Sequence, residues 1–131
     1  MTNTNIFKTL TDKKKLHPKN LCAAHININS LRYKLNDIVP ILNDGLADLL
    51  VISETKLDAS FPDAQFMVPG YKMYRKDRTA HGGGIITYVR SDIPNRRVAK
   101  FESSLIENIT LEITIGTKPW CILAMYITTW K

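Results

Sequence analysis

The sequence has few cysteines and no long apolar run. Its 131 residues include two cysteines, Cys22 and Cys121, which lie far apart in apolar surroundings without a CxxC spacing. This pattern predicts buried, reduced thiols and argues against a disulfide framework or a zinc site. A chain of this length can bury a core without such cross-links.

Signals for membranes and secretion are also missing. No apolar stretch approaches the 18 residues of a membrane helix, and the N-terminal segment MTNTNIFKTLTDKKK lacks the features of a signal peptide. We therefore expect an intracellular protein, nuclear or cytoplasmic, with no membrane partner. The glycine run at 82–84 lacks the Gly-Lys-Ser/Thr of a phosphate loop, so a hairpin turn is expected there.

Positive charge is in excess and unevenly distributed. The formal net charge is +6, and segment 72–100 carries eight basic residues against two acidic ones. A basic segment of this kind suits a polyanion, because each neutralised phosphate releases condensed counterions. A solvated hairpin face explains the same charges equally well.

The chain divides near residue 19. Residues 1–19 are polar and Lys-rich without sustained periodicity, and Pro18 closes them. We expect a flexible lead-in over 1–19, followed by one domain over 20–131.

The first part of the domain predicts a crossover unit. Residues 21–28 are expected to form a short apolar strand, and the apolar positions after Ser30 follow helical spacing, with Ser30 as the expected N-cap. Pro40 is expected to kink or split this helix. The next apolar run, 49–53, is a second strand, and a strand, helix, strand order of this length predicts parallel strands.

Strand patterns dominate the rest of the domain. They are expected at 71–75, 84–90, 98–101, 109–115 and 120–127. The predicted fold class is therefore α/β, a mixed sheet with flanking helices and a strand-rich second half.

Two polar side chains stand at the ends of the first two strands. Glu54 follows the strand at 49–53, and Asn27 stands near the end of the strand at 21–28. Each alone is explained by a local capping role. Parallel strands joined by one crossover, however, bring both residues to one sheet edge, where open α/β sheets bind ligands. One carboxylate with few other protein ligands is how Mg²⁺ is usually held.

The last apolar run, WCILAMYI, ends near Tyr126. Tyr126 is either a third group at a strand end or a tyrosine of the core. A nearly continuous apolar strand is typical of burial on both faces. We expect an exposed apolar face here, with a tendency to aggregate or to need a partner.

A family resemblance connects these segments. In order, HININSLR, LLVISETKLDASFPDAQF, PGYKMYRKDR, HGGGIITYVR and LIENITLEI resemble the N-terminal half of the endonuclease/exonuclease/phosphatase family, in particular the apurinic-type endonuclease of LINE-like (jockey-type, non-LTR) retrotransposons. The resemblance implies a four-layered α/β sandwich that cleaves DNA phosphodiester bonds with Mg²⁺ or Mn²⁺. It further implies that Glu54 is a metal ligand, that Asn27 orients the phosphate and the attacking water, and that Tyr126 lies near the scissile phosphate.

The later motifs of that family are absent. After Tyr126 the sequence reads ITTWK, and it contains neither the Asp-x-Asn nor the Ser-Asp-His motif. The resemblance thus implies a truncated endonuclease domain, a partial sandwich with its second half missing, which is expected to be inactive alone. Its partner would be the missing C-terminal half or the reverse transcriptase region. The alternative is a non-catalytic nucleic-acid-binding or interaction module that uses the basic segment 72–100.

Overall fold

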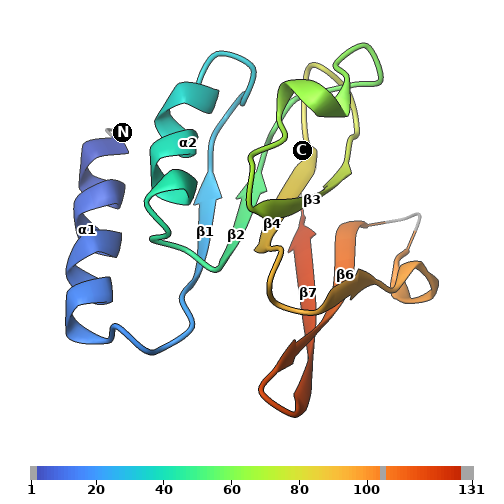
Figure 1. The fold of residues 1–131 in the computed structure, drawn as a ribbon. Coiled ribbons are helices and arrows are strands. Elements are labelled where there is room, and N and C mark those ends of the chain that lie inside the picture. Colours follow the sequence, from blue (N-terminus) through green and yellow to red (C-terminus); the bar gives the residue numbers. More distant parts are fainter. Residues whose placement is uncertain (1–2, 104–105, 128–131) are drawn as a thin grey trace.

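The structure, a computed structural model, describes residues 3–103 and 106–127 (Figure 1). The elements follow in chain order: α1 (Asn3–Leu16), β1 (Ala23–Asn27), α2 (Leu35–Asn43), β2 (Leu49–Ser53), the 3₁₀ helix η1 (Asp63–Gln65), β3 (Tyr71–Lys76), β4 (Ile85–Arg90), β5 (Asn95–Arg97), the 3₁₀ helix η2 (Ala99–Phe101), β6 (Glu107–Ile115) and β7 (Lys118–Tyr126). No helix in this part of the chain is long and apolar enough to span a membrane.

The strands form two sheets. The first has the order β1-β2-β4-β3, in which β1 and β2 are parallel and the other neighbours are antiparallel. The second is the antiparallel sheet β5-β6-β7. The parallel pair and its crossover through α2 confirm the predicted unit, and β3 and β4 confirm the predicted hairpin around the glycine run.

Two apolar clusters lie between three layers, which are the helices, the first sheet and the second sheet. Alternate residues of a strand point to opposite faces, and β4 contributes to both clusters. Ile86 and Tyr88 pack toward the helices, whereas Ile85 and Val89 pack toward the second sheet. Helices α1 and α2 therefore cover one face of the first sheet and the second sheet covers the other (Figure 1). The predicted α/β class, a mixed sheet with flanking helices, is confirmed.

The N-terminal segment differs from its prediction. Residues 3–16, expected to be flexible, form helix α1. Leu10 is buried, and Ile6 and Phe7 pack against the same cluster as α2. Three apolar side chains within five residues provide a narrow packing stripe, which stabilises a helix whose remaining residues are mostly polar.

The helix after β1 also starts later than predicted. Ser30 does not cap it, because its backbone has φ of 87° and lies outside the helix, which begins at Leu35. Pro40 does not split the helix either, and its carbonyl accepts the Asp44 N–H at 3.0 Å. The predicted strand at 98–101 is wrong, since the paired residues are Asn95–Arg97 and a 3₁₀ turn follows.

Candidate functional site

Asn27 and Glu54 meet at the carboxyl edge of the first sheet. Asn27 ends β1 and stands beside Ser53, the last residue of β2, so Glu54 begins the adjacent loop. The Asn27 Nδ2 group donates a hydrogen bond to Glu54 Oε2 at 2.6 Å. The predicted juxtaposition is therefore present. The roles of metal ligand and phosphate-orienting residue stay predictions.

The loops after β1 and β2 continue the parallel pairing beyond the strands. The backbone N–H groups of Ile28, Ser30 and Leu31 donate to the carbonyls of Ser53, Glu54 and Thr55, at 3.0, 2.8 and 3.0 Å respectively. These bonds align both loops over several residues. The position of Glu54 is thus fixed by backbone bonds as well as by its own side chain.

This edge carries unusual backbone conformations. In the described part of the chain, the non-glycine residues with positive φ are Asn29 at 49°, Ser30 at 87°, Glu54 at 55° and Lys56 at 54°. The left-handed region costs free energy for residues with a Cβ, and such strain concentrates at functional sites, where the surrounding structure maintains it. All four residues lie in the two aligned loops, which marks this edge as the leading candidate site.

The glycine run supports the Glu54 loop from the other side. The N–H groups of Thr55 and Lys56 donate to the carbonyls of Gly84 and Gly83, at 3.3 and 2.9 Å. Gly84 has φ of 97°, and a Cβ there would overlap Thr55 Oγ1. A side chain at this position would therefore displace the buried Thr55 side chain. The sequence predicted the hairpin turn but not this contact.

Glu107 of β6 holds the glycine run in place. Its Oε1 accepts the Gly84 N–H at 2.9 Å, and its Oε2 pairs with Arg78 Nε at 2.8 Å. Glu107 could not be identified from the sequence, because its bond to Gly84 spans 23 residues and no local pattern signals it.

Tyr126 lies beside Glu107 in the second sheet. The two residues are cross-strand partners at the end of the β6–β7 pair, and their side chains share a face. The Tyr126 side chain is half-buried and packs against the apolar cluster between the sheets. Its register thus places it next to the residue that contacts Gly84. A direct role near a phosphate stays a prediction.

Cationic side chains surround Asn29. Lys56 Nζ donates to Asn29 Oδ1, and Lys34 Nζ donates to the carbonyls of Ile28 and Asn29 at 2.8 and 3.0 Å. Two ammonium groups at a sheet edge that also carries Glu54 give this region both signs of charge. Such an arrangement suits a phosphate group accompanied by a cation.

His25 is the remaining polar residue on this face of β1. Its Nε2 lies 3.0 Å from Ser53 Oγ, across the parallel pair. His25 is therefore hydrogen-bonded within the sheet.

The donors near Glu54 fit a weakly held oxygen-ligated cation. In residues 3–103 and 106–127, no three His, Cys, Asp or Glu side chains lie close enough together to hold a metal ion. The donors present are the carboxylate of Glu54 and the side-chain oxygen of Asn27, whereas Asn29 Oδ1 already accepts from Lys56 Nζ. Mg²⁺ commonly uses one or two carboxylates and keeps several waters, so these donors suit Mg²⁺ or Mn²⁺ rather than a closed zinc site.

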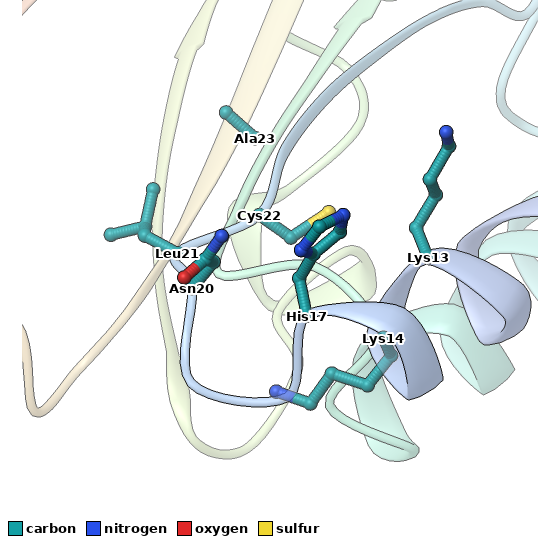
Figure 2. A pocket seen from close by; sticks show the side chains of 7 residues that line it. All are labelled: Lys13, Lys14, His17, Asn20, Leu21, Cys22 and Ala23. Atoms are coloured by element: carbon teal, nitrogen blue, oxygen red, sulfur yellow. The ribbon is translucent and has the colours of Figure 1, made fainter.

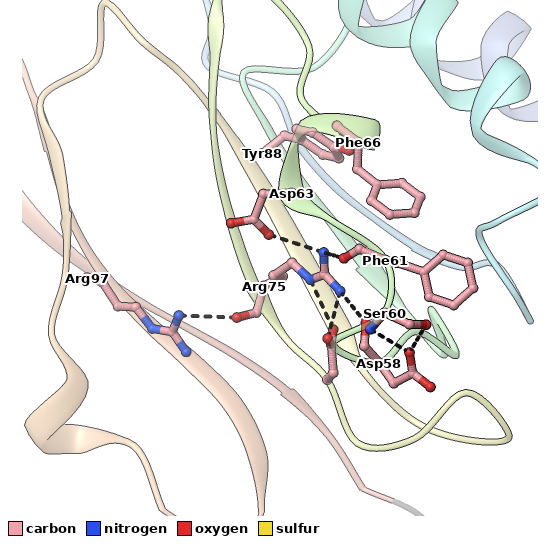
Figure 3. Close-up of polar contacts among 9 residues, drawn as sticks. Asp58, Ser60, Phe61, Asp63, Phe66, Arg75, Tyr88 and Arg97 are labelled. Carbon is pink, nitrogen blue, oxygen red and sulfur yellow. Dashed lines mark hydrogen bonds and ion pairs between the residues drawn. The ribbon is translucent and has the colours of Figure 1, made fainter.

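Arg75 anchors the segment that follows the site. Its guanidinium donates to the carbonyls of Asp58 and Phe61 at 3.1 and 2.7 Å and pairs with Asp63 and Asp77 (Figure 3). The Ser60 hydroxyl and N–H groups both bind the Asp58 carboxylate and hold its pKa below the usual range. The loop after Glu54 is therefore tied to β3 along much of its length.

The arginines of the basic segment 72–100 all have carboxylate partners. The pairs are Arg75 with Asp63 and Asp77, Arg78 with Glu107, Arg90 with Asp48 and Asp92, Arg96 with Glu112, and Arg97 with Glu102. These carboxylates offset the guanidinium charges of the segment, so its excess of positive charge rests on Lys72, Lys76 and Lys100.

A separate hollow lies at the amino end of β1, away from Glu54. It has a volume of about 240 Å³ and is lined by Lys13, Lys14, His17, Asn20, Leu21, Cys22 and Ala23 (Figure 2). Cys22 is half-buried, and burial raises the pKa of its thiol, with the Asp48 carboxylate adding to the effect.

The fold of this chain is similar to that of solved AP endonucleases. The sequence matches no protein-family model and has no significant match among curated proteins. Among solved structures, the chain resembles the AP endonuclease LMAP of Leishmania major, with a TM-score of 0.60 and 18% identity over 79% of this chain. It also resembles an AP endonuclease of Archaeoglobus fulgidus, with a TM-score of 0.54 and 23% identity over 82% of this chain.

These matches cover only part of each relative. The chain spans 39% of the Leishmania protein and 41% of the Archaeoglobus protein. At this level of identity the likeness concerns the fold. The chain therefore has a fold similar to part of the AP endonucleases, with Asn27 and Glu54 together at the edge of its parallel strands.

Proposed function

We propose that this chain is the N-terminal portion of a metal-dependent endonuclease that hydrolyses phosphodiester bonds in DNA. The observation that carries the proposal is the hydrogen bond between Asn27 and Glu54, at the carboxyl edge of two parallel strands in an AP endonuclease-like fold. Ligands bind at this edge in open α/β sheets. The motif order around Glu54 supports the retrotransposon type, whose nick supplies the primer for reverse transcription.

The proposed reaction is hydrolysis. A water oxygen forms a bond to phosphorus while the bond from phosphorus to O3′ breaks. The departing O3′ takes up a proton, which leaves a 3′-hydroxyl and a 5′-phosphate. Glu54 would hold Mg²⁺ or Mn²⁺, and the ion, when bound, supplies neutralisation of the charge that develops on the phosphate oxygens.

The residues of this chain have distinct parts in the proposal. Asn27 orients the Glu54 carboxylate and contacts the phosphate, while Lys34 and Lys56 attract the DNA backbone electrostatically. Tyr126 is proposed to approach the scissile phosphate from the second sheet. No motif of this chain supplies a base for the attacking water. We therefore propose that further groups come from the C-terminal half of the domain or the reverse transcriptase region, and that the chain alone is inactive.

Mn²⁺ binding tests the metal site without requiring activity. In the wild-type chain, Mn²⁺ should broaden the NMR signals of the Asn27 side-chain amide and the Glu54 backbone amide. Glu54→Gln should abolish the broadening, because the amide is a neutral and weaker ligand. Glu112→Gln is the matched control, since Glu112 is an exposed carboxylate of β6 paired with Arg96.

Plasmid nicking tests the reaction itself. The wild-type chain with Mg²⁺ should leave supercoiled plasmid intact if the missing groups are essential. Nicking that depends on both Mg²⁺ and Glu54 would support the enzyme and contradict the proposed inactivity.

In the NMR experiment, Mn²⁺ broadening that persists unchanged in Glu54→Gln would refute the metal site.

A further inference from the structure

Tyr33 is an exposed aromatic residue in a loop that also contributes to the candidate site. Its relative exposure is 84%, the highest among the large hydrophobic side chains that the structure describes. It lies in the loop between β1 and α2. The earlier part of this loop is bonded to the backbone of Glu54 and Thr55 through Ser30 and Leu31. Tyr33 is therefore only a few residues from the backbone that fixes the site.

Arg32 orients the Tyr33 ring. Its guanidinium carbon lies 5.6 Å from the centroid of the Tyr33 ring and 4.9 Å from that of Phe61. The guanidinium also donates to the Ala80 carbonyl at 3.3 Å. Arg32 thus connects three loops at this edge, those carrying Tyr33, Phe61 and Ala80. A cation over an aromatic ring is attracted to its face, so the contact restrains the ring from one side.

The open part of the Tyr33 ring is consistent with a ligand contact. A single exposed aromatic residue is common on protein surfaces and needs no explanation. Tyr33 differs in that a half-buried arginine holds its ring, while Lys34 and Lys56 gather at the neighbouring Asn29. Aromatic side chains that stack on bases, next to cations that follow the backbone, are the usual means of binding unpaired nucleic acid.

We propose that Tyr33 is a stacking platform for an unpaired base of DNA bound at the Glu54 edge. The proposal rests on the function proposed above and narrows its substrate to DNA with an unpaired base close to the scissile phosphate. In a paired duplex, the faces of the bases are occupied by their neighbours. Tyr33 therefore contributes to binding only where a base is unstacked.

A fluorescent base tests the platform directly. The probe is an oligonucleotide with one 2-aminopurine, presented as a single strand, as an unpaired bulge in a duplex, and opposite its partner in a full duplex, all in EDTA. Wild-type protein should quench the single-stranded and bulged probes. Tyr33→Ala should weaken their binding roughly 5- to 100-fold and remove the quenching. Tyr33→Phe keeps the ring and should bind as wild type does.

Phe101 provides the matched control. It is 63% exposed, lies on η2, and has Lys100 Nζ 5.2 Å from its ring centroid, so it is a second exposed aromatic with a cation beside it. Phe101→Ala should leave binding and quenching unchanged. Equal loss in Phe101→Ala would overturn the proposal. The proposal would also be overturned if Tyr33→Ala weakened binding to the full duplex as much as it weakened binding to the unpaired probes.

The two proposals fail in different ways. If Tyr33-dependent quenching is present but Mn²⁺ broadening does not depend on Glu54, the platform stands and the metal-dependent nuclease does not. If Glu54 binds Mn²⁺ but Tyr33→Ala quenches the probes as wild type does, only the platform is refuted.

Discussion

The carboxylate of Glu107 accepts the backbone N–H of Gly84 at 2.9 Å and thereby connects the second sheet to the candidate site. Gly84 in turn accepts the N–H of Thr55, the residue after Glu54. Glu107 in the second sheet thus supports, through Gly84, the loop that carries Glu54 at the edge of the first sheet. The left-handed backbone of Glu54 is held between two segments, the loop after β1 and the glycine run.

Removing Glu107 should loosen this connection. In Glu107→Ala the Gly84 N–H loses a charged acceptor, and Arg78 loses its partner. Hydrogen exchange at the amides of Gly84 and Thr55 should accelerate roughly 10- to 100-fold, as expected for a lost bond to a charged group. Glu112→Ala removes an exposed carboxylate from the same strand and should change neither amide. Identical exchange in both variants would contradict the connection.

A side chain at Gly84 should be poorly tolerated. Gly84→Ala places a Cβ at φ of 97° and against Thr55 Oγ1. We expect a loss of about 2–4 kcal/mol in the free energy of unfolding, measured by urea denaturation, because strain and overlap both contribute. Gly116 also has positive φ, at 64°, but a Cβ there meets nothing within 4 Å. Gly116→Ala should cost only about 1–2 kcal/mol, and an equal loss in both variants would rule out the contact with Thr55.

The pair of Glu102 and Arg97 predicts a loss of stability in acid. The Arg97 guanidinium lowers the pKa of Glu102 below its usual 4.5, against the opposing effect of burial, and the Thr110 N–H adds to the lowering. Because the pKa is lower in the folded state, the stabilisation is present above pH 4.5 and is lost as the pH falls through the folded pKa.

Glu102→Gln tests this pH dependence. The Glu102 side chain is only 7% exposed, so the substitution should lower the free energy of unfolding by about 1–3 kcal/mol at pH 7. The difference from wild type should shrink at pH 3. Glu112→Gln, in an exposed pair, should cost less than about 1 kcal/mol at either pH. A Glu102→Gln effect that is independent of pH would contradict the assignment.

The juxtaposition of Asn27 and Glu54 could be predicted from the sequence because it depends on local patterns. Two apolar runs, one crossover and the parallel register were sufficient to bring the ends of β1 and β2 together. The contacts that maintain the site could not be predicted in this way. Glu107 and Gly84 are 23 residues apart, and only the packing of two sheets brings them together.

The two errors in the helices have related causes. Ser30 has the residue type of an N-cap, but its N–H binds the carbonyl of Glu54, which draws its backbone into the left-handed region. Helix α1 has only a short apolar stripe, and this stripe stabilises the helix because it packs against the apolar cluster of α2 and the first sheet. In both cases, a tertiary contact outweighs the local preference.

The two cysteines should differ in reactivity. The sequence predicted both to be buried, whereas Cys121 is exposed on β7 and Cys22 is half-buried. Burial raises the pKa of Cys22, so it has less thiolate than an ordinary cysteine at neutral pH. In native protein at pH 7, a thiol reagent such as DTNB should modify Cys121 first and Cys22 much more slowly. Cys121→Ser should remove the fast phase, and a remaining fast phase would contradict the structure.

The outer face of β7 should govern aggregation. In the described part of the chain β7 is the last strand of its sheet, and Leu123 and Met125 on its outer face are 49% and 41% exposed. An exposed apolar edge strand can pair with another chain, and a lysine on it opposes that pairing. Leu123→Lys should therefore reduce the concentration-dependent association of the chain, measured by light scattering.

Leu16 provides the control, because it is 70% exposed at the end of α1, away from any sheet edge. Leu16→Lys adds the same charge there and should have little effect. If both lysine variants suppress association equally, net charge rather than the β7 edge controls it.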